Sequence, residues 1–207
     1  MIFQPISRDF PLILASSSPR RKRLLKQIGI PFLSRSSNVE ENLIAAQSTI
    51  SPRLLAKKKA ETVYLESHKN WMLGADTIVV LGETVLGKPK DPEDAQSMLS
   101  ELSGKEHKVI TGFCLLDPSG GLARAEEITT LVRVKKLAEQ EIIDYIATGE
   151  PFGKAGSYGI QGIGAFMVET ISGSYSNVVG LPLSALIKAL CRTGALMSFP
   201  IPARLKG

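Results

Sequence analysis

Two hairpin patterns limit what this chain of 207 residues can fold into. In residues 71–91, a short apolar strand, a Gly-Ala-Asp-Thr break and a β-branched strand lead to a tight turn at Gly82 and Glu83, followed by a returning strand. Residues 107–117 and 122–136 form two longer strand patterns joined through Pro-Ser-Gly-Gly. Because hairpin strands pair antiparallel, we do not expect a purely parallel, doubly wound sheet.

Helix patterns alternate irregularly with these strands, and three of them open on a capping residue followed by proline. The pairs are Ser18-Pro19, Ser51-Pro52 and Asp91-Pro92. Further helices are predicted over residues 138–149 and 181–194, and strands over 11–16 and 164–171. The mixture predicts an α/β fold with a curved, mixed, partly antiparallel sheet flanked by helices, in two lobes around a cleft.

No linker divides the chain, so we expect one domain over residues 11–194. An N-terminal extension (residues 1–10) precedes it and a loosely ordered tail (residues 195–207) follows it. No apolar stretch is long enough to span a bilayer, and no signal-peptide pattern opens the chain. Cys114 and Cys191 share no motif spacing, which predicts neither a disulfide nor a zinc site. We therefore expect a cytoplasmic protein that does not bind membranes.

Positive charge is concentrated at the beginning of the chain. Residues 1–60 carry 11 Lys and Arg against 3 Asp and Glu, whereas the rest carries 14 against 17. This asymmetry indicates a localised anion site, although a solvated basic face would also explain it.

The segment Leu-Ile-Leu-Ala-Ser-Ser-Ser-Pro-Arg-Arg, residues 12–21, joins a strand to a helix. A helix N-terminus presents unpaired N–H groups, to which Ser16 and its neighbours add hydroxyls and Arg20 and Arg21 add guanidinium groups. The segment therefore predicts phosphate binding, without a Walker A motif; the alternative is a plain capped basic helix.

Asp76 follows Gly74 and Ala75, which leave room for a ligand near the backbone. A carboxylate at the end of a buried strand is typical of a metal ligand or general base, and the acidic pair Glu40 and Glu41 could join it around a divalent cation. A turn aspartate and a solvated acidic loop would explain the same residues.

Two lysines are further candidates for anion binding. Lys59 shares a helical face with Leu55 and Val63 and should face the protein body, where it needs an anion. Lys88 lies between a strand and a proline turn, so its position is restricted. Either could equally be a surface lysine with a buried stem.

Residues 153–166 contain five glycines, which favour close approach of the backbone to a planar ligand. The amide of Gln161 both donates and accepts, which suits the O4 and N3–H edge of uracil or thymine. A merely structural loop is the alternative. No convincing nucleophile is present, and neither His68 nor His107 has a local partner, so water activated by a carboxylate and a metal is the simplest mechanism.

Four blocks of this sequence, spread over residues 11–190, resemble the Maf family of nucleoside triphosphate pyrophosphatases. The first begins with LILASSSPRRKRLL, the second is GADTIVVLGETVLGKPKD, the third is MLSELSGKEHKVITG and the fourth begins with KAGSYGIQGIGAFMVET. The resemblance implies a catalytic domain similar in fold to the inosine triphosphate pyrophosphatases and commonly dimeric. It also implies hydrolysis between the α- and β-phosphates with Mg²⁺ or Mn²⁺, and a link to arrest of cell division.

The resemblance also assigns roles to individual residues. The catalytic aspartate falls on Asp76, which with Glu40 would hold the metal. Substrate-binding and specificity positions fall on Ser16, Arg20, Lys59, Thr77, Lys88 and Gln161, whereas Arg21 is a substrate-binding candidate from the opening segment alone. Gln161 in Tyr-Gly-Ile-Gln-Gly resembles the branch that acts on dTTP and UTP, whereas glutamate marks the branch that acts on methylated GTP. Gly153 departs from the family pattern, which usually has an acidic residue there.

Three further functions stay open at this point. A nucleic-acid-binding module would normally interleave aromatic residues with cations, but aromatics are only 6% of this chain. The chain could also be a nucleotide-binding regulator of septum formation, or a pyrophosphatase directed at purines or methylated GTP. We expect a nucleoside triphosphate substrate and no stable nucleic-acid partner.

Overall fold

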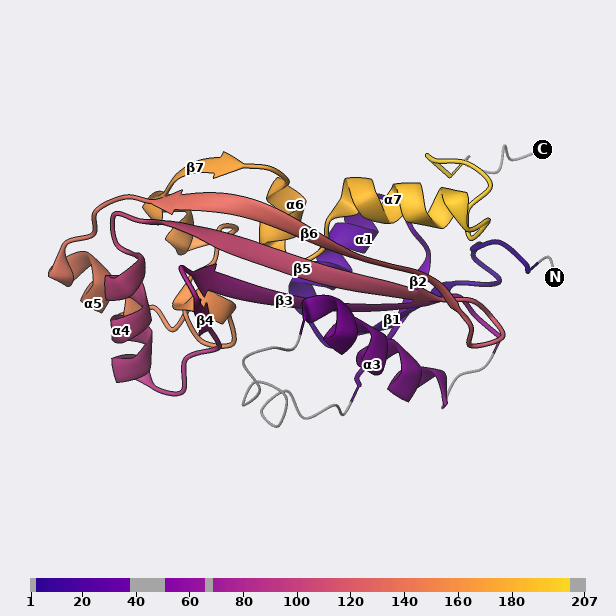
Figure 1. Cartoon of the computed structure of the whole chain (residues 1–207), viewed down its shortest axis with the longest axis horizontal. Coiled ribbons are helices and arrows are strands. Elements are labelled where there is room, and N and C mark those ends of the chain that lie inside the picture. Colours follow the sequence, from indigo (N-terminus) through magenta and orange to yellow (C-terminus); the bar gives the residue numbers. More distant parts are fainter. Residues whose placement is uncertain (1–2, 38–50, 66–68, 202–207) are drawn as a thin grey trace.

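The computed structural model describes residues 3–37, 51–65 and 69–201, within which seven strands form one sheet (Figure 1). Their order is β2-β1-β3-β5-β6-β7, and β4 pairs with β3. β1 pairs parallel with β2 and β3, and every other pair is antiparallel, which confirms the predicted mixed sheet. The strands are β1 (Leu12–Ala15), β2 (Phe32–Arg35), β3 (Met72–Leu81), β4 (Thr84–Leu86), β5 (Glu106–Leu116), β6 (Leu122–Val134) and β7 (Val168–Ser172).

The predicted helix starts are confirmed, because Ser18, Ser51 and Asp91 each cap a helix whose first residue is proline. The described helices are α1 (Pro19–Gln27), α3 (Pro52–Tyr64), α4 (Pro92–Leu102), α5 (Glu139–Ala147), α6 (Tyr175–Val179) and α7 (Leu183–Arg192), with 3₁₀ helices η1 (Ala155–Ser157) and η2 (Ile163–Met167). None of the helices in these ranges is long and apolar enough to cross a membrane.

Helices cover both faces of the sheet around β1. Leu12 and Leu14 pack in a core cluster with α1 and α7, whereas Ile13 and Ala15 pack in another with α3. Because successive strand residues point to opposite faces, a strand buried on both sides is apolar throughout, as β1 is.

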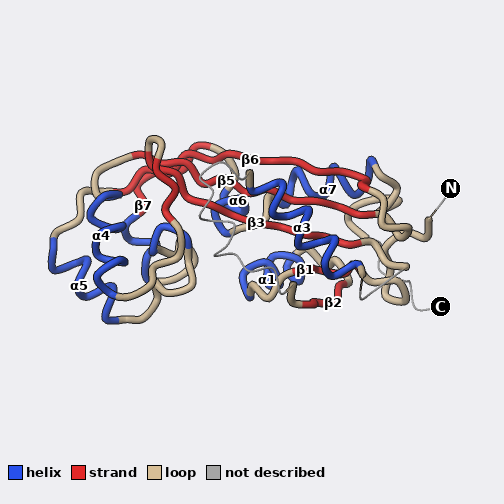
Figure 2. The backbone as a smooth tube through the Cα atoms, turned by 60° about the horizontal axis from the view of Figure 1, so that its bottom comes forward, coloured by secondary structure: helices blue, strands red, loops and turns tan. Residues whose placement is uncertain are grey.

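A third core cluster lies where α4 and α5 pack against the far ends of the long strands. Figures 1 and 2 show these two helices at one end of the molecule and α1, α3 and α7 toward the other. This arrangement confirms the two predicted lobes, and a cleft between them stays a prediction.

The core also includes residues on either side of the predicted domain limits. The backbone N–H of Ile6 donates to the carbonyl of Ala195 over 2.8 Å, and Ile6, Ala195 and Leu196 are all buried. The described ends of the chain therefore pack on each other and on the domain between them.

The predicted break at residues 74–77 is wrong, because β3 runs without interruption through Asp76, which pairs with Gly112 of β5. The glycines serve close packing of α3 instead. A Cβ at Gly74 would lie 2.0 Å from the carbonyl oxygen of Ala56, and one at Gly112 would lie 2.2 Å from the backbone nitrogen of Arg53. A glycine inside a strand thus marks the approach of a helix here.

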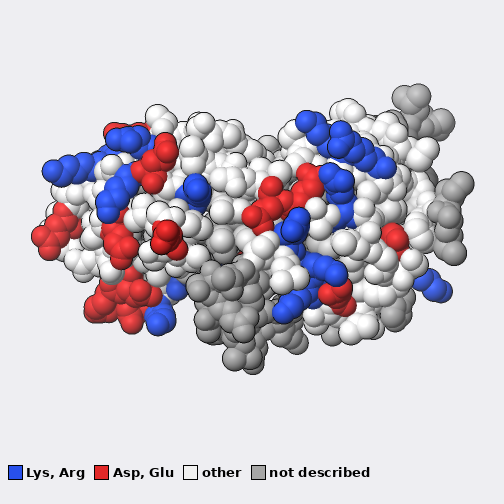
Figure 3. Space-filling model, in the orientation of Figure 1, with Lys and Arg blue, Asp and Glu red and all other residues white. Residues whose placement is uncertain are grey.

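Basic and acidic side chains alternate on the face that α3 occupies (Figure 3). Lys57 pairs with Glu61 on α3 at 3.5 Å, and Arg124 pairs with Glu126 on β6 at 2.7 Å. These cations therefore have acidic partners on their own elements.

We predict that Gly74→Ala lowers the free energy of unfolding by about 3 kcal/mol, because the new methyl group overlaps the backbone of α3. Urea denaturation measures the change. The matched control is Gly87→Ala, since a Cβ there meets nothing within 4 Å. Equal unfolding midpoints for the two variants would contradict the close packing of α3.

Candidate active site

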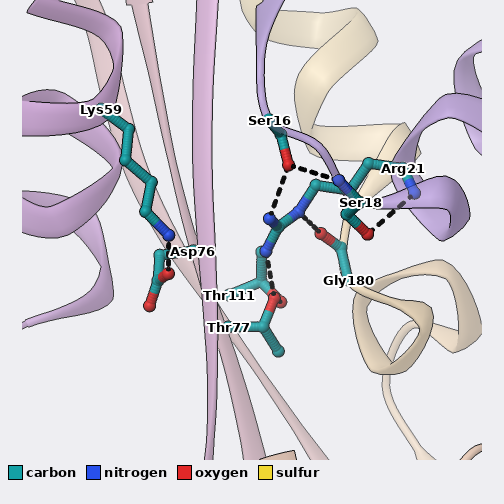
Figure 4. Close-up of polar contacts among 8 residues, drawn as sticks. All are labelled: Ser16, Ser18, Arg21, Lys59, Asp76, Thr77, Thr111 and Gly180. Carbon is teal, nitrogen blue, oxygen red and sulfur yellow. Dashed lines mark hydrogen bonds and ion pairs between the residues drawn. The ribbon is translucent and has the colours of Figure 1, made fainter. Parts of the chain in front are cut away.

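A buried ion pair joins α3 to the middle of β3. Lys59 Nζ lies 2.6 Å from Asp76 Oδ1, and the two side chains are only 5% and 12% exposed. A charge so deeply buried needs a compensating partner, which is the reason the helical position of Lys59 predicted an anion. The second carboxylate oxygen of Asp76 points away from Lys59 (Figure 4).

Arg21 makes hydrogen bonds to three separate segments of the chain on the other face of β3 (Figure 4). Its Nε donates to the carbonyl of Gly180 at 2.8 Å, its Nη1 to Ser16 Oγ at 3.1 Å and its Nη2 to Thr77 Oγ1 at 3.0 Å. The guanidinium is buried. The sequence predicted that Arg21 turns to a phosphate beside Arg20, whereas the structure directs all three of its nitrogens to protein oxygens.

The hydroxyl of Thr77 belongs to a directed chain of hydrogen bonds. Thr111 Oγ1 donates to the carbonyl of Asn177 over 3.1 Å, so it must accept from Thr77 Oγ1, 2.9 Å away. Since Thr77 also accepts from Arg21, its only hydroxyl hydrogen and one lone pair are already used. The chain fixes the Thr77 side chain, and a substrate role for it stays a prediction.

Asp76 and Thr77 are consecutive residues of one strand, so their side chains point to opposite faces of the sheet. On the edge away from β5, β1 pairs with β3 up to Gly74, and β4 begins to pair at Val79. Within the described ranges, residues 75–78 of β3 therefore have no partner strand on this edge. Ser16 follows the end of β1, and Lys88 follows the end of β4, so both flank this unpaired segment.

Two cations from distant parts of the chain, Arg20 and Lys154, interact electrostatically. Burial lowers the pKa of Arg20. The pKa of Lys154 is lowered by burial and by the positive charge of Arg20, against the opposing effect of Glu150. Each positive charge disfavours the other, and a nearby anion would relieve this repulsion. The sequence pattern did not point to Lys154, although it is the only cation of the glycine-rich stretch 153–166.

The remaining predicted site residues lie in exposed positions or outside the described residues. Gln161 is exposed between η1 and η2, and Lys88 is exposed after β4. The N–H of Gly156 donates to the carbonyl of Gly87 at 3.0 Å, which attaches the glycine-rich stretch beside Lys88. Glu40 lies outside the described residues.

Of the two metal ligands predicted from the sequence, Asp76 lies in the described part of the chain. No group of three or more His, Cys, Asp or Glu side chains that could hold a metal occurs there. The outward oxygen of Asp76 fits as a single donor, because carboxylate oxygen is the ligand type that Mg²⁺ and Mn²⁺ prefer.

A buried histidine contacts a tyrosine of the glycine-rich stretch. His107 Nε2 lies 2.8 Å from the hydroxyl of Tyr158, and the rings meet edge to face. Among the described residues Nδ1 has no hydrogen-bond partner. Burial lowers the pKa of His107 from 6.5 to about 4, so the imidazole is neutral at pH 7. His107 has no partner near it in the sequence, but in the fold it contacts Tyr158, 51 residues further along the chain.

We predict that His107 makes the fold less stable in acid. The unfolded chain protonates this residue near pH 6.5 but the folded one only near pH 4, so its contribution is complete above pH 6.5 and is lost as the pH falls toward 4. Between pH 7.5 and 5 the loss is about 2 kcal/mol. In urea unfolding, the difference between wild type and His107→Gln should change by this amount; an unchanged difference would contradict it.

The sequence that forms this fold and this site belongs to a known family. The family model described as "Maf-like protein" matches residues 11–193, and the chain belongs to this family. A protein of Ruminiclostridium cellulolyticum named "dTTP/UTP pyrophosphatase" is 51% identical over 177 residues, which cover 84% of this chain and 92% of the relative. One of Syntrophotalea carbinolica with the same name is 46% identical over 198 residues, covering 94% and 90%.

Two solved structures superpose only loosely on this chain. A nucleoside-triphosphatase / dITP/XTP pyrophosphatase from Mycobacterium abscessus is 13% identical with a TM-score of 0.45, covering 93% of this chain and 100% of that one. The Staphylococcus aureus Ham1 protein gives a TM-score of 0.37 at 14% identity, covering 60% and 71%. Overlaps this loose carry no argument about function.

Proposed function

We propose that this protein hydrolyses dTTP and UTP to the monophosphate and pyrophosphate. The observation that carries the proposal is its identity of 51% over 92% of a relative named for that activity. The site supports it, because the buried carboxylate of Asp76, paired with Lys59, lies on the part of β3 that has no partner strand on one edge within the described ranges.

Asp76 acts in this proposal as the general base. Its outward oxygen takes the proton from a water whose oxygen attacks the α-phosphorus, and the oxygen that links the α- and β-phosphates leaves with pyrophosphate. Lys59 holds the other oxygen at 2.6 Å and so orients the carboxylate. Asp76 and Glu40 would hold Mg²⁺ or Mn²⁺, which would supply charge neutralisation at the phosphate oxygens.

The cations of the site offset charge on the triphosphate. Arg20 and Lys154 favour an anion between them, and Lys88 and Ser16 flank the unpaired segment of β3. Arg21 is proposed to position Ser16 and Thr77 for this task. Gln161, exposed on its loop, reads the uracil or thymine edge.

The wider setting is also proposed. We infer one catalytic domain that includes residues 11–194 and acts as a homodimer in the cytoplasm on the nucleotide pool. The link to arrest of cell division rests on the family resemblance alone.

We predict that Asp76→Asn lowers kcat by at least about 100-fold and leaves KM within about 3-fold, because an amide is not a base at neutral pH. Release of pyrophosphate from dTTP measures both constants. Asp144→Asn, which changes an exposed carboxylate on α5, is the control. Normal turnover by the Asp76 variant would show that another group removes the proton.

We predict that Gln161→Glu lowers kcat/KM for dTTP by about 10-fold or more, because a carboxylate cannot donate to O4 of the base. The measured ratio of dTTP to methylated-GTP hydrolysis should fall. The control Gln140→Glu alters an exposed glutamine of α5. An unchanged ratio would remove Gln161 from base recognition.

A further inference from the structure

The loop that carries Gln161 is attached to one carboxylate, that of Glu150. Its Oε2 accepts the N–H of Ile163 at 2.7 Å, and its Oε1 accepts the N–H of Gly164 at 3.0 Å. Oε1 also accepts the hydroxyl of Tyr145 at 3.0 Å. That hydroxyl oxygen accepts the N–H of Gly159 at 3.1 Å. Both sides of the loop are therefore tied to the same pair of side chains.

The glycines of the loop fit this attachment. A Cβ at Gly162 would lie 2.2 Å from Glu150 Oε2, and one at Gly164 would lie 2.7 Å from the Tyr145 hydroxyl. A Cβ at Gly159 would lie 3.2 Å from Glu150 Oε1. The sequence attributed the glycines to a planar ligand, but three of them have these protein groups as neighbours.

The carboxylate is held in its charged form. Burial acts to raise the pKa of Glu150, but the hydrogen bonds from Gly164, Ile163 and Tyr145 and the charge of Lys154 outweigh it and lower the pKa. Lys154 Nζ also donates to the backbone carbonyl of Glu150. The mechanism proposed above uses neither Glu150 nor Tyr145.

Tyr145 is the rigid part of the arrangement. It comes from α5, is buried in the core cluster of α4 and α5, and meets Phe166 edge to face. Tyr158, directly before the loop, is fixed by His107 of β5. The loop is thus joined to the sheet and to α5, while Gln161 itself is exposed between the anchors.

We propose that Glu150 and Tyr145 are positioning residues for base recognition, which hold the backbone on both sides of Gln161 and so aim its amide. Gln161 lies two residues after Gly159 and two before Ile163, so few backbone torsions separate it from an anchored N–H. Holding a recognition group in place before binding removes an entropic cost of binding. The inference rests on the proposed function, since it takes Gln161 as the base reader.

The decisive variant is Tyr145→Phe, which keeps the ring and removes the hydroxyl that joins Gly159 to Glu150. We expect KM for dTTP to rise about 10-fold with kcat within about 3-fold, the size expected for losing a hydrogen bond to a charged group. Ribose 5-triphosphate, which has no base, should be hydrolysed as by wild type. Glu150→Gln should act in the same direction, because an amide cannot accept at both of its terminal atoms.

A double-mutant cycle tests whether the effect passes through Gln161. In a Gln161→Ala background, Tyr145→Phe should change KM for dTTP by no more than about 2-fold, because the side chain that it positions is gone. Hydrogen exchange should show faster exchange of the amides of residues 159–164 in Tyr145→Phe. Tyr175→Phe, at an exposed tyrosine of α6, and Glu139→Gln, at an exposed glutamate of α5, are the matched controls.

Three outcomes would overturn the proposal. These are an unchanged KM for dTTP, an equal loss on ribose 5-triphosphate, which indicates general damage, and full additivity with Gln161→Ala. Failure of the proposed function gives a different result, in which wild type releases no pyrophosphate from either substrate. Calorimetric titration with non-hydrolysable α,β-imido-dUTP then decides: about 10-fold weaker binding by Tyr145→Phe supports the positioning role, and equal or absent binding overturns it.

Discussion

The close approach of α3 to the sheet is the constraint on which this site depends. Gly74 and Gly112 leave no side chain between the helix and strands β3 and β5, so the backbone of α3 lies directly on them. Lys59 can then reach Asp76 at 2.6 Å in a place from which water is largely excluded. Removing water strengthens the attraction between the charges and also makes each one costly without the other. The pair and the packing of α3 therefore support each other.

The cations of the opening segment have separate tasks, although they are neighbours in the sequence. Arg21 turns inward and joins Gly180, Ser16 and Thr77, which come from three parts of the fold. Arg20 stays half-buried and near Lys154. Because successive residues of a helix point about 100° apart, adjacent arginines cannot share one environment. Arg21 therefore joins three parts of the fold, whereas Arg20, the preceding residue, lies in a different environment.

Local features of the fold could be predicted well, and features that depend on distant packing could not. Ser18, Ser51 and Asp91 cap helices as expected, because a cap bonds to a backbone N–H within three residues of itself. The break expected at Gly74 is absent because the reason for that glycine lies in α3, and nothing near it in the sequence shows this. Lys154 and Glu150 were missed for the same reason, because their interactions are with residues outside their own sequence neighbourhood. Lys154 interacts electrostatically with Arg20, and Glu150 accepts a hydrogen bond from Ile163.

The sequence by itself determined the family and supplied the buried pair, a carboxylate at Asp76 and a lysine at Lys59. It also determined the mixed sheet, because the residues that form a hairpin turn are adjacent in the sequence. Only the tertiary structure decided which groups face each other. Arg21 meets Gly180, 159 residues further along the chain, and Asp76 and Thr77 lie on the part of β3 where β1 has ended and β4 has not begun. Such pairings are set by how helices and strands pack, and packing depends on the whole chain at once.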